Sequence, residues 1–77
     1  MGSRVRTTVR KRAIRLPRKT TSVTLEDAFW SALKEIGAAK DTSRAALVQE
    51  IDKKRQHGNL SSAVRLFILE YYRERAR

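Results

Sequence analysis

The sequence predicts a mainly α-helical domain with one β-strand per chain, completed by antiparallel pairing of that strand with the same strand of a second copy. Three observations predict it. One short segment alternates strictly between apolar and polar residues; three later segments carry apolar residues at steps of three and four; and no other segment alternates well enough to pair with the strand. Because a lone strand leaves its N–H and C=O groups unpaired, we expect a homodimer, and a higher oligomer stays possible.

Residues 1–18 are predicted to be a flexible basic N-terminal arm, and residues 19–77 the folded domain. The arm has no sustained periodicity, and Pro17 would break a helix there. Eight of the 18 Lys and Arg residues lie before position 20, and the first acidic residue is Glu26. These eight are Arg4, Arg6, Arg10, Lys11, Arg12, Arg15, Arg18 and Lys19.

A net charge of +10 indicates an anionic partner: nucleic acid, an anionic membrane or an acidic protein. We expect double-stranded DNA, with no membrane partner. Arg15, Arg18 and Lys19 are expected on DNA phosphates, because they lie nearest to the predicted strand. The alternatives are that the arm only keeps the protein soluble or tethers it to a membrane surface.

The segment Thr20–Leu25 is the predicted strand. Val23 and Leu25 fall on its apolar face, and Thr20, Ser22 and Thr24 fall on the polar face. A two-stranded ribbon fits the major groove of DNA, where hydroxyl groups can donate to or accept from base edges. We therefore expect these three residues to contact bases. The alternative is a solvated strand face, and Thr24 could instead cap the first helix, since it has capping-box spacing with Asp27.

Three helices are expected after the strand: one from Glu26 to about Ala39, one capped by Thr42 or Ser43 and ending near Gly58, and one from Asn59 or Ser61 to about Arg75. Free N–H groups at the start of the second helix favour a phosphate site formed by Thr42, Ser43 and Arg44, although capping alone would also explain the two hydroxyl residues. The predicted dimer core consists of Val23, Leu25, Phe29, Leu33, Leu47, Val48 and Ile51.

Several functional classes find no support in the sequence. Cysteine is absent and His57 is the single histidine, so neither a metal site nor a cofactor is expected. Gly-rich phosphate loops and catalytic groupings are also missing, and we expect no enzyme activity. The longest apolar run, residues 66–69, is far too short to cross a membrane. Leu66 and Leu69 widen the apolar surface of the third helix, and the broad surface around Leu66, Leu69 and Tyr72 leaves a protein partner possible there.

Two segments carry a family resemblance. Residues 21–30 with Leu33, and residues 59–67, resemble the ribbon-helix-helix family of the Arc and methionine repressors, in a compact bacterial subgroup with a third helix. The resemblance implies an intertwined homodimer that reads DNA with outward strand side chains and holds phosphate at the start of the second helix. By position, Thr20, Ser22 and Thr24 fall on the base-reading sites, and Ser43 and Arg44 on the phosphate anchor.

This chain departs from many relatives in two places. It has Lys40-Asp41-Thr42 where they have a glycine-containing turn, and its strand lacks the long polar reader that they carry. The predicted function is a sequence-selective, dimeric transcriptional regulator in the bacterial cytoplasm, associated with the nucleoid. The alternatives are an antitoxin-like module that binds a protein through its third helix, and an architectural protein that coats DNA without preference.

Overall fold

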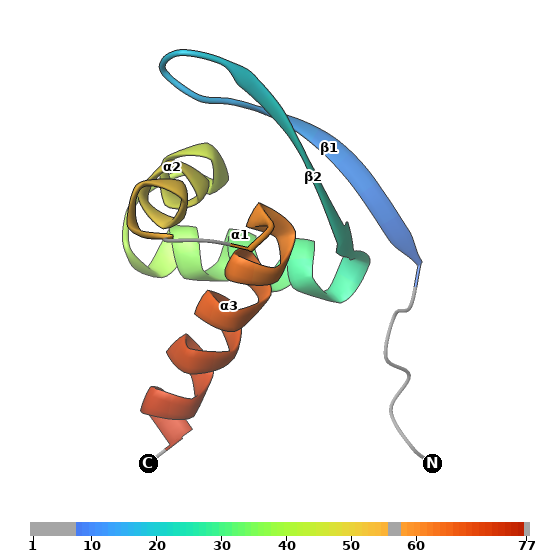
Figure 1. The fold of residues 1–77 in the computed structure, drawn as a ribbon. Helices are drawn as coiled ribbons and strands as arrows, with labels where there is room; N and C mark the ends of the chain where they lie inside the picture. Colours follow the sequence, from blue (N-terminus) through green and yellow to red (C-terminus); the bar gives the residue numbers. More distant parts are fainter. Residues whose placement is uncertain (1–7, 56–57, 77) are drawn as a thin grey trace.

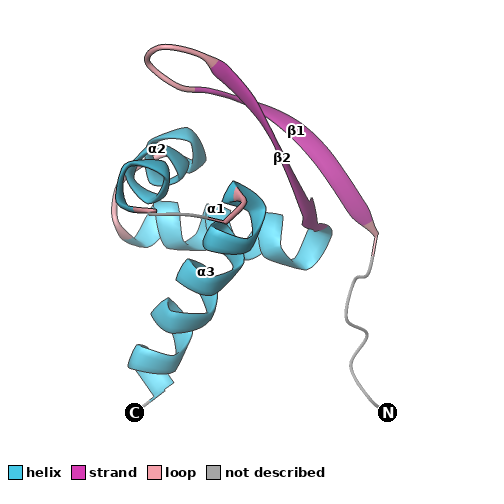
Figure 2. Cartoon of the chain, viewed as in Figure 1, coloured by secondary structure: helices cyan, strands magenta, loops and turns pink. Residues whose placement is uncertain are grey.

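A β-hairpin arches over three helices in the computed structural model, which describes residues 8–55 and 58–76 (Figure 1). The elements in chain order are β1 (Val9–Arg15), β2 (Thr20–Glu26), α1 (Asp27–Ala39), α2 (Arg44–Lys54) and α3 (Leu60–Ala76). Within the described residues, strand structure is confined to the hairpin, and the remaining elements are helical (Figure 2).

The hairpin corrects the predicted flexible arm and the predicted solitary strand. β1 pairs with β2 antiparallel, from Val9 opposite Glu26 to Arg15 opposite Thr20. The Leu16 N–H donates to the Lys19 carbonyl at 2.7 Å and closes a turn with two loop residues. The flexible-arm prediction is therefore wrong for residues 8–18, since even the Thr8 carbonyl accepts from the Asp27 N–H at 2.8 Å, and residues 1–7 of the arm lie outside the described part. The prediction of one strand per chain, paired only with a second copy, is wrong as well.

The core lies between the hairpin and the helices of this single chain. Of the residues predicted for a dimer core, Phe29 is half-buried and the other six are buried without a second copy. β1 contributes Ile14, and Leu16 follows it into the core; both had been assigned to the arm. The complete buried set is Ile14, Leu16, Val23, Leu25, Trp30, Leu33, Ile36, Leu47, Val48, Ile51, Leu60, Val64 and Ile68.

The helix boundaries follow the predicted capping only in part. Ser43 caps α2, and its Oγ accepts a hydrogen bond from the Ala46 N–H at 3.0 Å, as predicted. Gly58 has the expected positive φ of 87°, although α2 already ends at Lys54. The capping-box prediction for Thr24 is wrong: β2 extends to Glu26, which precedes α1 without a side-chain capping bond.

Helix α3 closes part of the outer edge of β2. The Thr24 N–H donates to Ser61 Oγ at 3.0 Å, and Arg65 Nη2 donates to the Thr24 carbonyl at 3.3 Å. Backbone groups alternate in direction along an antiparallel strand, so Thr20, Ser22 and Thr24 all direct theirs away from β1. The Thr24 groups are thus occupied by α3, which leaves the Thr20 and Ser22 end of this edge for other partners.

Candidate nucleic-acid interface

The outward face of the hairpin combines hydroxyl and basic side chains. Residues opposite one another on paired antiparallel strands share a face. The register therefore places Lys11 beside Thr24 and Arg15 beside Thr20. Lys11, Arg15 and Thr20 are exposed, whereas Thr24 is half-buried against α3. This face can offer both short hydroxyl contacts and long cationic ones to a ligand.

The third predicted base-reading residue, Ser22, lies at the centre of the same face, opposite Ala13, and both are exposed. β1 adds two long basic side chains, Lys11 and Arg15, to this face. Sequence reasoning had placed Arg15 in the arm and gave Lys11 no individual role. The detectable signal was the two-residue spacing of Lys11, Ala13 and Arg15, which puts all three on one side of a strand.

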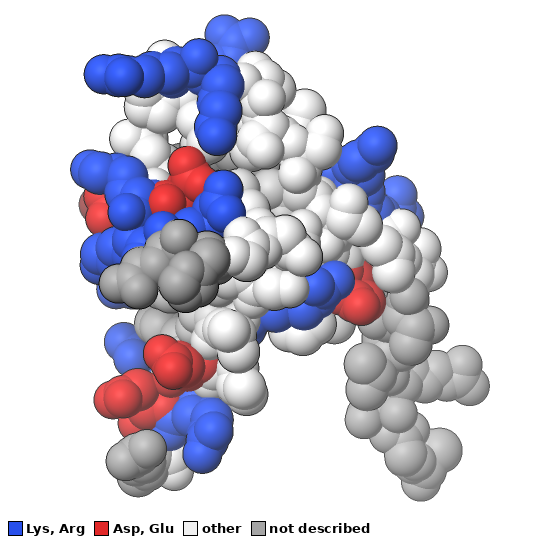
Figure 3. All heavy atoms as spheres, in the orientation of Figure 1, with Lys and Arg blue, Asp and Glu red and all other residues white. Residues whose placement is uncertain are grey.

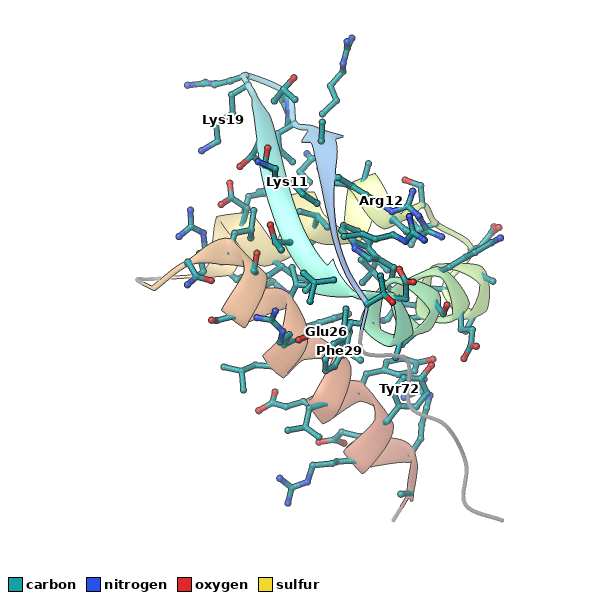
Figure 4. All side chains as sticks on the ribbon, turned by 90° about the vertical axis from the view of Figure 1, so that its right-hand side faces the viewer. Lys11, Arg12, Lys19, Glu26, Phe29 and Tyr72 are labelled. Atoms are coloured by element: carbon teal, nitrogen blue, oxygen red, sulfur yellow. The ribbon has the colours of Figure 1, made fainter. Side chains whose placement is uncertain are left out.

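The tip of the hairpin is strongly basic. Arg18 and Lys19, both predicted to contact phosphate, are exposed in and beside the turn. Figure 3 shows blue side chains gathered over this end of the molecule, and Figure 4 places Lys19 at the end of the hairpin. The structure thus brings these two residues to the tip, next to the outward face that carries Arg15.

The predicted phosphate residues at the start of α2 lie behind the hairpin, on the core side of β1. Thr42 and Ser43 are exposed, and Arg44 is half-buried. The Arg44 guanidinium lies over the Trp30 ring, with Cζ 5.9 Å from the ring centroid, and Arg12 of β1 lies over the same ring at 5.3 Å. Burial, and then the charge of Arg12, lower the pKa of Arg44.

Adjacent residues of β1 therefore lie beside two different groups of predicted site residues. One group is the predicted base-reading residues of β2, and the other is the predicted phosphate residues at the start of α2. Lys11 lies on the outward face with Thr24, and Arg12 lies on the core side with Arg44. Figure 4 shows Arg12 leaving β1 toward α1 and the start of α2. One strand thus links the base-reading set with the phosphate set, although the two sets occupy opposite faces of the hairpin.

Acidic side chains neutralise only some of the basic residues. The described part of the chain contains three salt bridges: Arg10–Asp27 at 2.7 Å, Arg55–Asp52 at 2.8 Å and Arg65–Glu26 at 3.1 Å. None of them involves Lys11, Arg15, the hairpin tip, Arg12 or Arg44, although Glu26 ends β2 on the same face as Thr24. These cations therefore remain available to an external anion.

Only part of the apolar surface that the sequence suggested for a protein partner is free on α3. Leu66 and Leu69 are 61% and 48% exposed on α3. Tyr72 lies against α1 instead, and its hydroxyl donates to Glu35 Oε1 at 3.0 Å. Desolvation, followed by this hydrogen bond, raises the pKa of Tyr72. The described residues hold no cluster of His, Cys, Asp and Glu that could bind a metal ion, and no described helix is long and apolar enough to span a membrane.

Comparison with known proteins supplies one match. Neither the curated proteins nor the solved structures compared with the chain gave a match. The family model described as "Ribbon-helix-helix domain" matches residues 9–72, a span that begins with β1 and extends into α3. That span covers the hairpin face, the basic tip and the start of α2. The chain therefore belongs to the ribbon-helix-helix domain family.

Proposed function

We propose that this protein is a double-stranded-DNA-binding transcriptional regulator that inserts the outward face of its hairpin into the major groove. The observation that carries the proposal is the cross-strand arrangement of Lys11 with Thr24 and Arg15 with Thr20, in which neither basic residue forms a salt bridge among the described residues. The ribbon-helix-helix family is, in general, a family of DNA-binding regulators without enzymatic activity, which supports the proposal.

The physical fit concerns both shape and chemistry. The major groove, about 12 Å wide, admits a two-stranded ribbon. Lys and Arg side chains suit the O6 and N7 acceptors of guanine, and threonine can contact the thymine methyl group. Lys11 and Arg15 would therefore supply most of the sequence selectivity, and Thr20, Ser22 and Thr24 the remainder. Arg18 and Lys19 at the tip would bind phosphates beside the groove.

Dimerisation is part of this proposal, because the family generally forms dimers. Each chain already pairs β2 with its own β1 and engages Thr24 on the other edge with Ser61 and Arg65. A second copy that leaves these contacts intact would therefore bring its own hairpin. Two such hairpins predict an operator with two half-sites, spaced by the geometry of the dimer.

The test compares two double variants that lose the same charge. Lys11→Ala/Arg15→Ala removes the cations of the outward face, and Lys54→Ala/Arg73→Ala removes two exposed cations from α2 and α3. Fluorescence anisotropy with a duplex selected from genomic fragments should show at least about a tenfold loss of affinity for the first variant, because each good bidentate base contact contributes about 1–3 kcal/mol of discrimination. The second variant should lose about threefold or less.

Salt and competitor experiments separate regulation from coating. If a dimer neutralises about eight phosphates, log affinity should fall with log salt at a slope of about −7. Random-sequence duplex should compete poorly with the selected duplex. Equal affinity for both would instead indicate an architectural coating protein, and equal losses for the two double variants would remove the outward face from DNA reading.

A second candidate function rests on the exposed apolar residues of α3. Leu66 and Leu69 could bind a protein partner in an antitoxin-like module whose DNA binding is autoregulatory. Co-purification of a stoichiometric partner that the variant Leu66→Ser/Leu69→Ser fails to retain would favour this function. An unchanged partner yield with that variant would reject α3 as the docking surface.

A further inference from the structure

The single tryptophan of the chain is buried, and two arginine side chains lie over its ring. Trp30 is 2% exposed, and its Nε1–H donates to the Arg10 carbonyl of β1 at 3.1 Å, which fixes the plane of the ring. The Arg12 guanidinium approaches this ring from β1 and the Arg44 guanidinium from the first turn of α2. Two elements distant in sequence thus present guanidinium groups around one rigid aromatic platform.

The two guanidinium groups gather without an acidic partner among the described residues. Arg10, two positions earlier on β1, is neutralised by Asp27, whereas Arg12 and Arg44 take part in none of the three salt bridges. Burial, and then the repulsion of the neighbouring Arg12 charge, lower the pKa of Arg44. An external anion would offset this repulsion.

The groove beside the pair carries further groups suited to an anion. Lys34 of α1 and Ser43 line it together with Arg12 and Arg44, and no acidic residue does. Arg12 and Arg44 also line the adjoining groove, together with Trp30 and Asp27, and there the Asp27 carboxylate is engaged by Arg10. Ser43 Oγ already accepts from Ala46, so the strongest donors available to a ligand are the two guanidinium groups and the Lys34 ammonium.

We propose that Arg12 and Arg44 together bind one phosphodiester group of the DNA backbone, with Lys34 as a third cation. This inference rests on the proposed function and adds β1 and α1 to the phosphate contact expected from α2 alone. A planar guanidinium matches the paired oxygens of a phosphate better than an ammonium does. Lys11 and Arg12 are adjacent on β1 and point to opposite faces of the hairpin, so a duplex that contacts both must place its phosphate against Arg12 around the β1 edge.

The test uses the full chain and two readouts. Trp30 is the only tryptophan, so its emission reports directly on this site, and anisotropy of a labelled duplex reports on binding. For the unaltered chain, we expect duplex to change the Trp30 emission. Arg12→Ala and Arg44→Ala should each lower duplex affinity about tenfold and reduce the magnitude of the salt slope by about 0.9, as expected for one lost phosphate contact.

Because both arginines are proposed to bind the same phosphate, the double variant should lose less affinity than the product of the two single losses. Arg12→Lys and Arg44→Lys keep the charge and should fall between the unaltered chain and the alanine variants. Arg73→Ala, an exposed cation near the end of α3, is the matched control and should change affinity less than twofold. Circular dichroism of each variant checks that the fold is retained.

The outcomes separate this inference from the proposed function. If the unaltered chain does not bind duplex, the proposed function fails and the phosphodiester site fails with it. If duplex binds but folded Arg12→Ala and Arg44→Ala behave like Arg73→Ala, only the inference is overturned. Titration with inorganic phosphate distinguishes a free anion from the DNA backbone as the ligand. If phosphate changes the Trp30 emission to saturation and duplex does not change it, the site binds free anions and the DNA backbone site is overturned.

Discussion

Two arginines of β1 occupy positions where an amphipathic strand usually has apolar residues. Arg10 and Arg12 alternate with Lys11 and share the core-side face with Ile14, yet both are exposed. Their charged ends reach Asp27 and the Trp30 ring, respectively. Long basic side chains can lie along apolar surface while their charged ends stay in water. Arg10 and Arg12 thus pack the hairpin against the helices through their aliphatic parts, and Arg12 also adds positive charge to the candidate site.

The contrast between a buried and an exposed leucine tests the core directly. Leu25 is 0% exposed on the core side of β2, and Leu66 is 61% exposed on α3. Leu25→Ala should lower the free energy of unfolding by about 2–5 kcal/mol, because it removes buried methyl groups and leaves a cavity. Leu66→Ala should change it by about 0.5 kcal/mol or less. Urea unfolding measures both, and equal effects would contradict the observed packing.

Glu26 predicts a pH dependence of stability. Hydrogen bonding from its own backbone N–H, and then from Arg65, lowers the pKa of Glu26 from its usual 4.5. A carboxyl group whose pKa is lower in the folded state stabilises the fold above its unfolded pKa, and this contribution is lost as pH falls through the folded pKa. Glu26→Gln should therefore be less stable than the unaltered chain at pH 7, and the difference should shrink below pH 4.5.

Urea unfolding of both proteins between pH 7 and about pH 2.5 measures that difference. Glu70→Gln, at an exposed position without a salt bridge in the described structure, is the control. A difference between Glu26→Gln and the unaltered chain that stays constant over the whole range would mean that the interaction of Glu26 does not depend on its charge.

At the scale of elements, the sequence predicted β2 and all three helices but not β1. β2 shows its apolar face through Val23 and Leu25, whereas the core face of β1 carries only Ile14 among arginines, so periodicity in apolar residues could not reveal it. β1 is a strand because it pairs with β2, and Trp30 adds a hydrogen bond to the Arg10 carbonyl from 20 positions later in the chain. Such a long-range contact is invisible to a local pattern.

The candidate site was predictable to a similar extent. Thr20, Ser22 and Thr24 were placed on one face by alternation alone, and the structure keeps them on one face of β2. Ser43 was assigned to the start of α2 by its capping chemistry. The neighbours of these residues were not predictable, since Lys11 and Arg12 reach them only through the hairpin register.

Gly37 controls the connection between α1 and α2. It is buried near the end of α1, its carbonyl accepts from the Thr42 N–H at 2.7 Å, and a Cβ at this position would lie 2.8 Å from the Thr42 carbonyl oxygen. Alanine has a helix propensity about 1 kcal/mol better than glycine. The backbone clash should outweigh that gain, so Gly37→Ala should destabilise the protein by about 1–3 kcal/mol.

Thermal and urea unfolding measure this effect, and Ala38→Gly provides the comparison. Ala38 is exposed in the same helix turn, so its substitution should cost only about 1 kcal/mol of propensity. If Gly37→Ala were more stable than the unaltered chain, Thr42 would have room to move, and the close approach of the two helices would not constrain the start of α2.

For the whole molecule, the central question is which chain supplies the partner strand of β2. β1 covers one edge of β2, and Ser61 and Arg65 hold Thr24 on the other. For two copies to share a ribbon, β1 would have to separate from β2 of its own chain. β1 competes well with a strand from a second copy, because the two-residue turn that joins it to β2 lowers the entropy cost of pairing. The ribbon is therefore complete in one chain, and a dimer would combine two finished hairpins.

A disulfide across the hairpin tests this arrangement. Ala13 and Ser22 are directly opposite on the outward face, and their backbone groups point away from each other's strand. Such pairs have Cα atoms about 4.5 Å apart, within the range that a disulfide bridges. The chain has no cysteine, so Ala13→Cys/Ser22→Cys introduces one defined pair. Oxidation should form an intrachain bond, leave the mass on a non-reducing gel unchanged, and stabilise the fold by about 2–3 kcal/mol.

The oxidised and reduced forms of that variant differ only in the disulfide. Comparing their DNA binding therefore distinguishes a ribbon formed within one chain from a ribbon shared between two chains. If DNA is read by a hairpin formed within one chain, the locked form should bind a duplex within about twofold of the reduced form, since the strands need not separate. A covalent dimer on oxidation would show that β1 pairs with β2 of a second copy. Loss of DNA binding in the intrachain-locked form, restored by reduction, would show that β1 must leave β2 before the protein binds.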